Sequence, residues 1–322
     1  NKITAGAVRW QEGLDVARKS LHQWPFDRDR VRMAVAPTIP AHCSDEFLVN
    51  AAKLTRDYDI GLHTHLAESK VQAVAGLKLY GKSLTAHLES LNVLGPNFTA
   101  AHGVWLDDED MLRLADTGSK IAHNPASNMR YGSGLAHVRR MIESDLVVGV
   151  GTDSRSCSDG LNMFEAMRLA SFTSRVQGPD YKRWLTTDEV FSMATVESAK
   201  ILGMADEIGV LAPGYKADIV FLDTQNPNYV PLTSVMDQIV NAENGSGVAS
   251  VMVGGRMVFD DGRITTLDYE ALVSKIENAI ERLREKGKRS SALAFKLEEI
   301  VGSFCVGLAN TPYHVHRYCG MP

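Results

Sequence analysis

Short apolar runs recur along the first two thirds of this chain, and amphipathic stretches separate them. Successive runs begin roughly 25–40 residues apart, which is the spacing of strand–helix–strand units. Because parallel strands need a crossover connection, this pattern predicts a parallel sheet flanked by helices. The five predicted strands are Val31–Pro37, Ile60–Leu66, Phe98–Val104, Lys120–His123 and Val147–Thr152.

Five strand–helix units fit either of two α/β architectures. A (β/α)8 barrel needs eight strands and typically about 250 residues, so five units alone do not close one. Either the sheet is open and doubly wound, or three further strands precede Asn1.

The remaining chain predicts helices and a small β-rich unit. A helix is expected over Ala5–Trp24, and another begins at Thr186, which forms a T-x-x-E capping box with Glu189 and extends to Leu202. Short strands and turns follow over residues 208–263, then a helix up to Gly287 and a weakly patterned tail over 290–322. We therefore expect a barrel unit over residues 1–203, part of a β-sandwich over 204–266, and a C-terminal helix and tail over 267–322.

Composition narrows the function classes. The net charge is −5 with no basic block, so nucleic acid is not an expected partner. No apolar run reaches the ~20 residues of a membrane helix. The four cysteines, Cys43, Cys157, Cys305 and Cys319, are too few and too scattered for a disulfide framework, which favours a reducing, cytoplasmic location.

Histidine or aspartate stands at the carboxyl end of four predicted strands, namely at His65, His102, His123 and Asp153. Ligands and catalytic groups gather at this edge of parallel α/β folds. Imidazole and carboxylate are typical zinc ligands. The pattern predicts a metal-dependent hydrolase.

Several motifs, found in a set order along the chain, resemble those of a known enzyme family. They are Gly61-Leu-His-Thr-His-Leu-Ala-Glu68, Ala101-His-Gly103, His123-Asn-Pro-Ala-Ser-Asn128, Gly149-Val-Gly-Thr-Asp153 and Ile208-Gly-Val-Leu-Ala-Pro-Gly-Tyr-Lys-Ala-Asp218. With these motifs the chain resembles the amidohydrolase superfamily, in the branch of guanine, cytosine and S-adenosylhomocysteine deaminases and chlorotriazine hydrolases. The resemblance covers about Ala36 to Gly262 and implies a (β/α)8 barrel with a flanking β-sandwich.

The resemblance also implies roles for four residues. His65 is the metal ligand from the fifth barrel strand, and Asp153 is the ligand from the eighth strand and the base for the attacking water. Glu68 binds the substrate and protonates a ring nitrogen. His102 contributes to substrate binding, since it hydrogen-bonds to the attacking water or to the tetrahedral intermediate. The Ser127-Asn128 turn is expected to be structural, and His123 and Asn124 to orient their strand end.

The chain departs from the family pattern in two places. The H-x-H pair of the family's first strand, which supplies two metal ligands, has no counterpart upstream of His63. His63 is expected to face away from His65 and to pack between sheet and helix, while His314 and His316 are expected to pack in the tail. The residue after Asp153 is Ser154 rather than the glycine of many relatives, so the loop Ser154–Gly160 is expected to shape the pocket.

The expected activity is hydrolytic deamination of an amino-substituted purine, pyrimidine, pterin or triazine. One divalent metal is expected per subunit, zinc in the first place, with iron or manganese as alternatives. Chloride or an alkylamine is the alternative leaving group. Two other classes stay open: a metal-free, non-catalytic barrel, and an open-sheet nucleotide binder, which would lack a glycine-rich phosphate loop.

Two further expectations concern the assembly. We expect a homo-oligomer that takes a small heterocycle as its partner. We also expect the complete catalytic unit to include about 100–150 residues upstream, at ~30 residues for each strand–helix unit, with the missing H-x-H among them.

Overall fold

The structure is a computed structural model that describes residues 9–318. Its centre is a five-stranded parallel sheet in the order β1-β2-β3-β4-β5. Each strand falls within one of the five apolar runs, so the α/β prediction is confirmed. The strands are β1 (Ala34–Val35), β2 (Gly61–Leu66), β3 (Phe98–His102), β4 (Lys120–His123) and β5 (Val147–Val150).

The two faces of this sheet differ in burial. The register places Thr64, Ala100, Ile121 and Val148 in one row, and each of these side chains is at most 4% exposed. The neighbouring row holds His65, Ala101, Ala122 and Gly149. Buried, mostly apolar side chains thus fill the first row, whereas the second row holds His65 and small residues.

Several helices begin at a residue whose side chain caps them. The hydroxyl of Ser44 accepts the amide of Phe47, and Thr186 and Glu189 form the predicted capping box. The helix predicted from Thr186 to Leu202 is broken at Thr195 into two. The helices of this part are α1 (Trp10–His22), α2 (Asp45–Asp57), α3 (Lys70–Tyr80), α4 (Leu84–Ser90), α5 (Asp108–Asp116), α6 (Pro125–Arg130), α7 (Val138–Glu143), α8 (Arg155–Ser158), α9 (Met163–Arg175), α10 (Thr187–Ala194) and α11 (Val196–Ile201), with 3-10 turns η2 (Pro40–His42) and η3 (Tyr181–Arg183).

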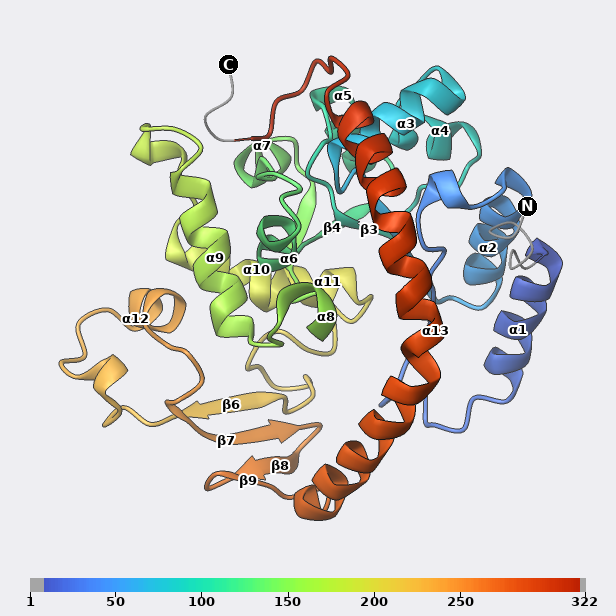
Figure 1. Cartoon of the computed structure of the whole chain (residues 1–322). Helices are drawn as coiled ribbons and strands as arrows, with labels where there is room; N and C mark the ends of the chain where they lie inside the picture. The colour runs from blue at the N-terminus through green and yellow to red at the C-terminus, as the bar shows by residue number, and fades with distance from the viewer. Residues whose placement is uncertain (1–8, 319–322) are drawn as a thin grey trace.

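A second, antiparallel sheet lies below the α/β unit in Figure 1. Its order is β6-β7-β8-β9, in agreement with the β-rich unit that the sequence predicts. The described residues form a single layer here, without a second sheet of a sandwich. Its elements are β6 (Ile219–Leu222), η4 (Pro227–Tyr229), α12 (Val235–Asn241), β7 (Val248–Val253), β8 (Arg256–Asp260) and β9 (Arg263–Ile264).

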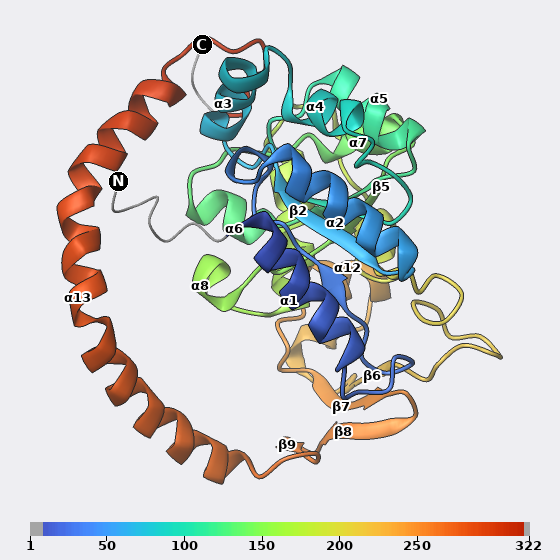
Figure 2. The same ribbon diagram turned by 90° about the vertical axis from the view of Figure 1, so that its right-hand side faces the viewer.

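The last helix, α13 (Tyr269–Ala309), is longer than the sequence predicts. The tail expected from residue 290 is helical to Ala309, because strong helix formers such as Ala, Leu, Lys and Glu dominate it. The helix runs from the antiparallel sheet to the end of the molecule near α3 and α5 (Figures 1 and 2), and none of its residues is buried.

The domain limits expected at residues 203 and 266 fall in the connections from α11 to β6 and from β9 to α13, and remain predictions. Cys43, Cys157 and Cys305 are free thiols, and Cys319 lies outside the described residues. Across residues 9–318, no helix combines the length and apolarity that a membrane crossing would require.

Candidate active site

Four polar side chains meet at the carboxyl edge of the parallel sheet. His65 lies near the end of β2, His102 ends β3, His123 ends β4 and Asp153 follows β5. The backbone φ is 76° at His102 and 58° at Asp153. Such left-handed conformations cost about 1–3 kcal/mol each and persist where the surroundings hold them, often at functional sites.

His65, His102 and Asp153 form one cluster. The imidazoles of His65 and His102 are stacked, with ring centroids 5.5 Å apart and planes 16° apart. The His102 Nε2 atom lies 3.9 Å from the Asp153 Oδ2 atom, which is too long for a direct hydrogen bond. The structure therefore brings together three of the four residues to which the sequence assigned roles.

The tautomer of His65 follows from its hydrogen bond. Its Nδ1 atom contacts the carbonyl oxygen of Thr38, just after β1. Because a carbonyl only accepts, Nδ1 carries the proton, so the lone pair of the neutral tautomer lies on Nε2. A hydrogen bond of this kind orients metal-ligating histidines.

Asn128 is the hydrogen-bond partner of the His102 ring. Its side-chain oxygen accepts a hydrogen bond of 2.9 Å from the His102 Nδ1 atom, and both residues are at most 2% exposed. Helix α6, which begins with Pro125 at its first position, carries Asn128 to this place. The sequence assigned this turn a structural role and missed the contact, although the motif that ends in Asn128 was the available signal.

Asp153 is kept ionised by its neighbours. Burial raises the pKa of its carboxyl, but the Ser127 hydroxyl, the Ser154 amide, His102 and His65 outweigh burial and lower this pKa below its ordinary value. The Ser154 amide donates to the Asp153 Oδ1 atom at 2.6 Å. An ionised carboxylate suits both a metal ligand and a proton acceptor.

Glu68 lies three residues beyond His65 and is oriented by α3. The side-chain amide of Gln72 donates to the Glu68 Oε2 atom at 3.1 Å, and its oxygen accepts the Glu68 amide at 3.1 Å. This double contact with Gln72 restrains the Glu68 side chain.

The prediction that His63 faces away from His65 is wrong. Residues two apart in a strand share a face, and the burial alternation of β2 confirms that His63 and His65 do so. The pKa of His63 is lowered by burial and by nearby His65 and His102, and its Nε2 atom is buried without a hydrogen-bond partner.

His123 is a fourth histidine beside the cluster. It is 2% exposed, and neither ring nitrogen has a hydrogen-bond partner. Burial, followed by the charge of His102, lowers its pKa to about 3, so the ring is neutral.

The other histidines lie elsewhere. Both His314 and His316 are exposed. His316 packs edge-on against Tyr318 of the tail, whereas His314 Nε2 contacts Asp107 Oδ2 at 2.8 Å, outside the tail in which it was expected to pack. Over residues 9–318, no group of three or more His, Cys, Asp or Glu side chains is arranged to hold a metal ion.

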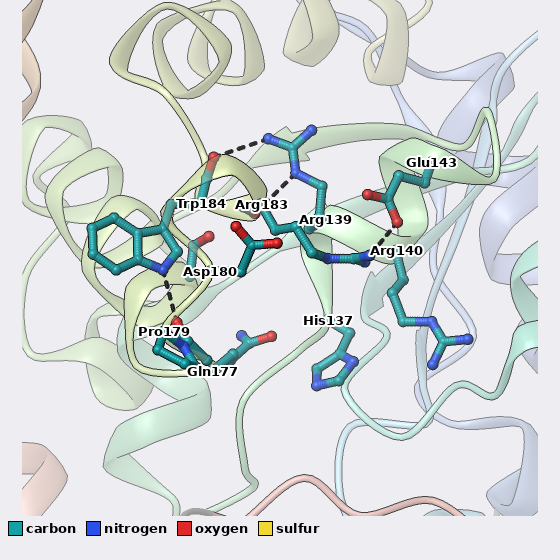
Figure 3. Close-up of a pocket in the computed structure, with 11 residues that line it drawn as sticks. His137, Arg139, Arg140, Glu143, Gln177, Pro179, Asp180, Arg183 and Trp184 are labelled. Atoms are coloured by element: carbon teal, nitrogen blue, oxygen red, sulfur yellow. Dashed lines mark hydrogen bonds and ion pairs between the residues drawn. The ribbon is translucent and has the colours of Figure 1, made fainter.

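A cavity of about 570 Å³ lies apart from this cluster, between α7 and the segment around η3 (Figure 3). Its arginines are already engaged. Arg139 donates to the backbone oxygens of Arg183 and Trp184, and Arg183 pairs with Glu143. None of the strand-end residues lines this cavity.

In a comparison with known proteins, residues 14–258 match the amidohydrolase family. The chain is 34% identical over 260 residues to 5'-deoxyadenosine deaminase of Methanobrevibacter smithii, covering 80% of this chain and 60% of that protein. It is 35% identical over 274 residues to 5-methylthioadenosine/S-adenosylhomocysteine deaminase of Halothermothrix orenii, covering 84% and 63%. The chain thus spans less than two thirds of the length of these relatives.

Two solved structures share the fold. An adenosine deaminase from Xanthomonas campestris with bound zinc superposes with a TM-score of 0.80 at 25% identity, covering 84% of this chain and 62% of that one. A variant of atrazine chlorohydrolase from Arthrobacter aurescens, complexed with zinc and atraton, superposes with a TM-score of 0.78 at 28% identity, covering 83% and 59%.

Proposed function

Because the chain belongs to the amidohydrolase family, we propose that the protein hydrolyses an amino-substituted nitrogen heterocycle and releases ammonia. The observation that carries this proposal is the convergence of His65, His102 and Asp153 at one sheet edge. Glu68, three residues after His65, is held by Gln72. We infer catalytic roles for Glu68, His102 and Asp153, and metal-ligand roles for His65 and Asp153.

The chemistry of the donors fits part of a metal site. His65 presents the unprotonated Nε2 atom and Asp153 an ionised carboxylate, both typical of zinc. Catalytic zinc sites use at least three protein ligands, and the family pattern implies four, so these two residues are an incomplete set. We propose zinc as the metal, with iron or manganese as alternatives, and an H-x-H pair on a further strand as the remaining ligands.

A bound divalent metal lowers the pKa of water toward about 7. The side chains of this chain supply the other steps. Asp153 accepts the proton of the attacking water, and Glu68 donates a proton to the ring nitrogen beside the carbon under attack. His102 donates a hydrogen bond to the oxygen that develops negative charge. Asp153 then returns its proton to the amine, which leaves as ammonia, and the hydroxyl proton of the intermediate passes to Glu68 as the carbonyl of the product forms.

Adenosine-type nucleosides are the first substrate class to test, because the most similar relatives are named deaminases of 5'-deoxyadenosine and related compounds. Loss of chloride or an alkylamine from a triazine is the second candidate, favoured by the likeness to atrazine chlorohydrolase. A non-catalytic role accounts less well for the oriented Glu68 and for the locked tautomer of His65.

The test is an ammonia-coupled screen of the intact protein, loaded with zinc, over aminopurine nucleosides, aminopyrimidines, pterins and aminotriazines. Chloride release from chlorotriazines is followed in parallel, and Glu68→Gln is the inactive control. We expect ammonia release from at least one aminopurine nucleoside. Turnover of esters or phosphates alone would contradict the proposal.

Three statements about the intact protein remain predictions. We propose that a closed catalytic barrel includes three strands beyond the five described, since two of four expected metal ligands are absent from the described site. A homo-oligomeric state and a cytoplasmic location are the other two.

A further inference from the structure

The segment that follows α13 folds back onto the strand-end edge. We call residues 313–318 the C-terminal strap. It crosses the end of the molecule near α5 and α7 (Figure 1), although more than 180 residues separate Arg317 in sequence from the residues it contacts. The family match ends at residue 258, so the strap lies beyond the part of the chain that the family shares.

Arg317 anchors the strap. Its side chain is buried, with the residue 8% exposed, and it forms no ion pair with any residue of the described part. Instead, Nε donates to the Val104 oxygen at 2.8 Å and a terminal nitrogen donates to the Leu106 oxygen at 2.7 Å. A rigid guanidinium fork binds two carbonyls at once, which an ammonium group does not reproduce.

The carbonyls that Arg317 binds belong to the loop after His102. His102 ends β3, and Gly103 with its φ of 60° turns the chain into Val104. The strap therefore restrains the loop directly attached to a residue of the candidate site.

The strap also contacts the loop that follows α6, the helix that carries Asn128. The Arg317 oxygen accepts the Leu135 amide at 2.9 Å. Gly134 lies against it so closely that an added Cβ would be 2.8 Å from this oxygen. The backbone amide of Ser133 in turn donates to the backbone carbonyl oxygen of Asn128 at 2.8 Å.

Trp105 joins the two loops beneath the strap. Its indole nitrogen donates to the Ser133 oxygen at 2.6 Å. The rings of Tyr313 and Tyr318 pack edge-on against it, at centroid distances of 6.1 and 5.0 Å. Both loops that determine the position of the His102 ring are therefore bound to one another and to the strap.

We propose that the C-terminal strap is a positioning element for His102, and that Arg317 is its central positioning residue. Loss of the fork frees the loops 103–107 and 128–135 to move apart. The His102 ring then loses its fixed orientation toward Asp153, while His65 and Asp153 keep their places. The part of the proposal that concerns turnover rests on the proposed function.

The experiment compares three variants in the intact protein. Arg317→Met removes the fork and keeps the apolar stem, and Gly134→Ala disturbs the same contact from the other loop. Arg284→Met, at an exposed position on α13, is the matched control. Hydrogen exchange read by mass spectrometry follows the two loops, and the NMR signal of the His102 Nδ1 proton, assigned with Asn128→Ala, follows the ring.

We expect at least about tenfold faster exchange in both loops, which corresponds to about 1.4 kcal/mol, and a weakened His102 signal in the first two variants only. In the zinc-loaded enzyme, kcat should fall about 10–100-fold with KM and metal content nearly unchanged. Arg317→Lys should restore part of the protection from hydrogen exchange, because the lysine side chain reaches one of the two carbonyls.

Unchanged exchange, an unchanged His102 signal or unchanged kcat in Arg317→Met would each overturn the proposal. If Arg317→Met does not fold, His314→Ala, which removes only the exposed contact with Asp107, decides it by the same readouts. If the parent protein turns over no heterocycle, the proposed function fails, and the exchange and NMR measurements still decide whether the strap positions His102.

Discussion

Asn128→Ala is the substitution that tests the candidate site most directly. It removes the only hydrogen bond that the structure assigns to the His102 Nδ1 atom, at 2.9 Å between two residues that are at most 2% exposed. A buried N–H group left without an acceptor costs about 1–3 kcal/mol. At about 2.1 cal/mol/K of unfolding entropy per residue, each kcal/mol lowers the Tm of a 322-residue chain by about 1.5 °C.

The loss of turnover should exceed what the loss of stability explains. Without Asn128 the His102 ring is free to rotate, and loss of an orienting partner typically costs about 10–100-fold in activity. Asn97→Ala is the matched control. The side-chain amide of Asn97, near the opposite end of β3, donates to the Thr55 hydroxyl at 3.0 Å and to the backbone oxygen of Ile60 at 3.1 Å.

The assay combines urea denaturation with kcat at saturating substrate. We expect both variants to lose a similar free energy of unfolding, and only Asn128→Ala to lose turnover. A kcat of Asn128→Ala within about threefold of the parent, or equal losses of kcat in both variants, would refute the inference that Asn128 orients a catalytic histidine.

Three further predictions concern charge and metal. Glu68→Gln should lower kcat by about 10²–10⁴-fold and keep the metal, whereas Asp153→Asn should lose both; kinetics and metal analysis check this, and metal loss in Glu68→Gln would contradict it. The intact protein should bind one divalent metal per subunit after repletion, and well under half an equivalent by elemental analysis would contradict this. Burial raises the pKa of Asp110 from 3.8 to about 6, so the native state binds the extra proton between these values and the free energy of unfolding falls as pH rises through this window. Asp110→Asn should remove that fall and gain about 1–3 kcal/mol near pH 7, and urea midpoints that follow the parent at each pH would show that Asp110 does not cause it.

Local patterns in the sequence were sufficient for much of the fold. Short apolar runs, their spacing and the capping box at Thr186 are properties of neighbouring residues, and they predicted all five parallel strands and the β-rich unit. They failed at Thr195, where the backbone leaves the helical region (φ −121°, ψ −85°), and beyond residue 290, where helix propensity extends α13 without burial.

By itself, the sequence determined which chemical groups stand at the strand ends, because the strand positions follow from apolar periodicity and parallel strands bring their carboxyl ends to one edge. The tertiary structure alone decided how those groups are oriented. The bond from His65 to Thr38, the bond from His102 to Asn128, and the strap contacts of Arg317 join residues 26 to 213 positions apart. No local pattern encodes such contacts, since they arise only when packing brings distant backbone groups within hydrogen-bonding distance of the histidines and their loops.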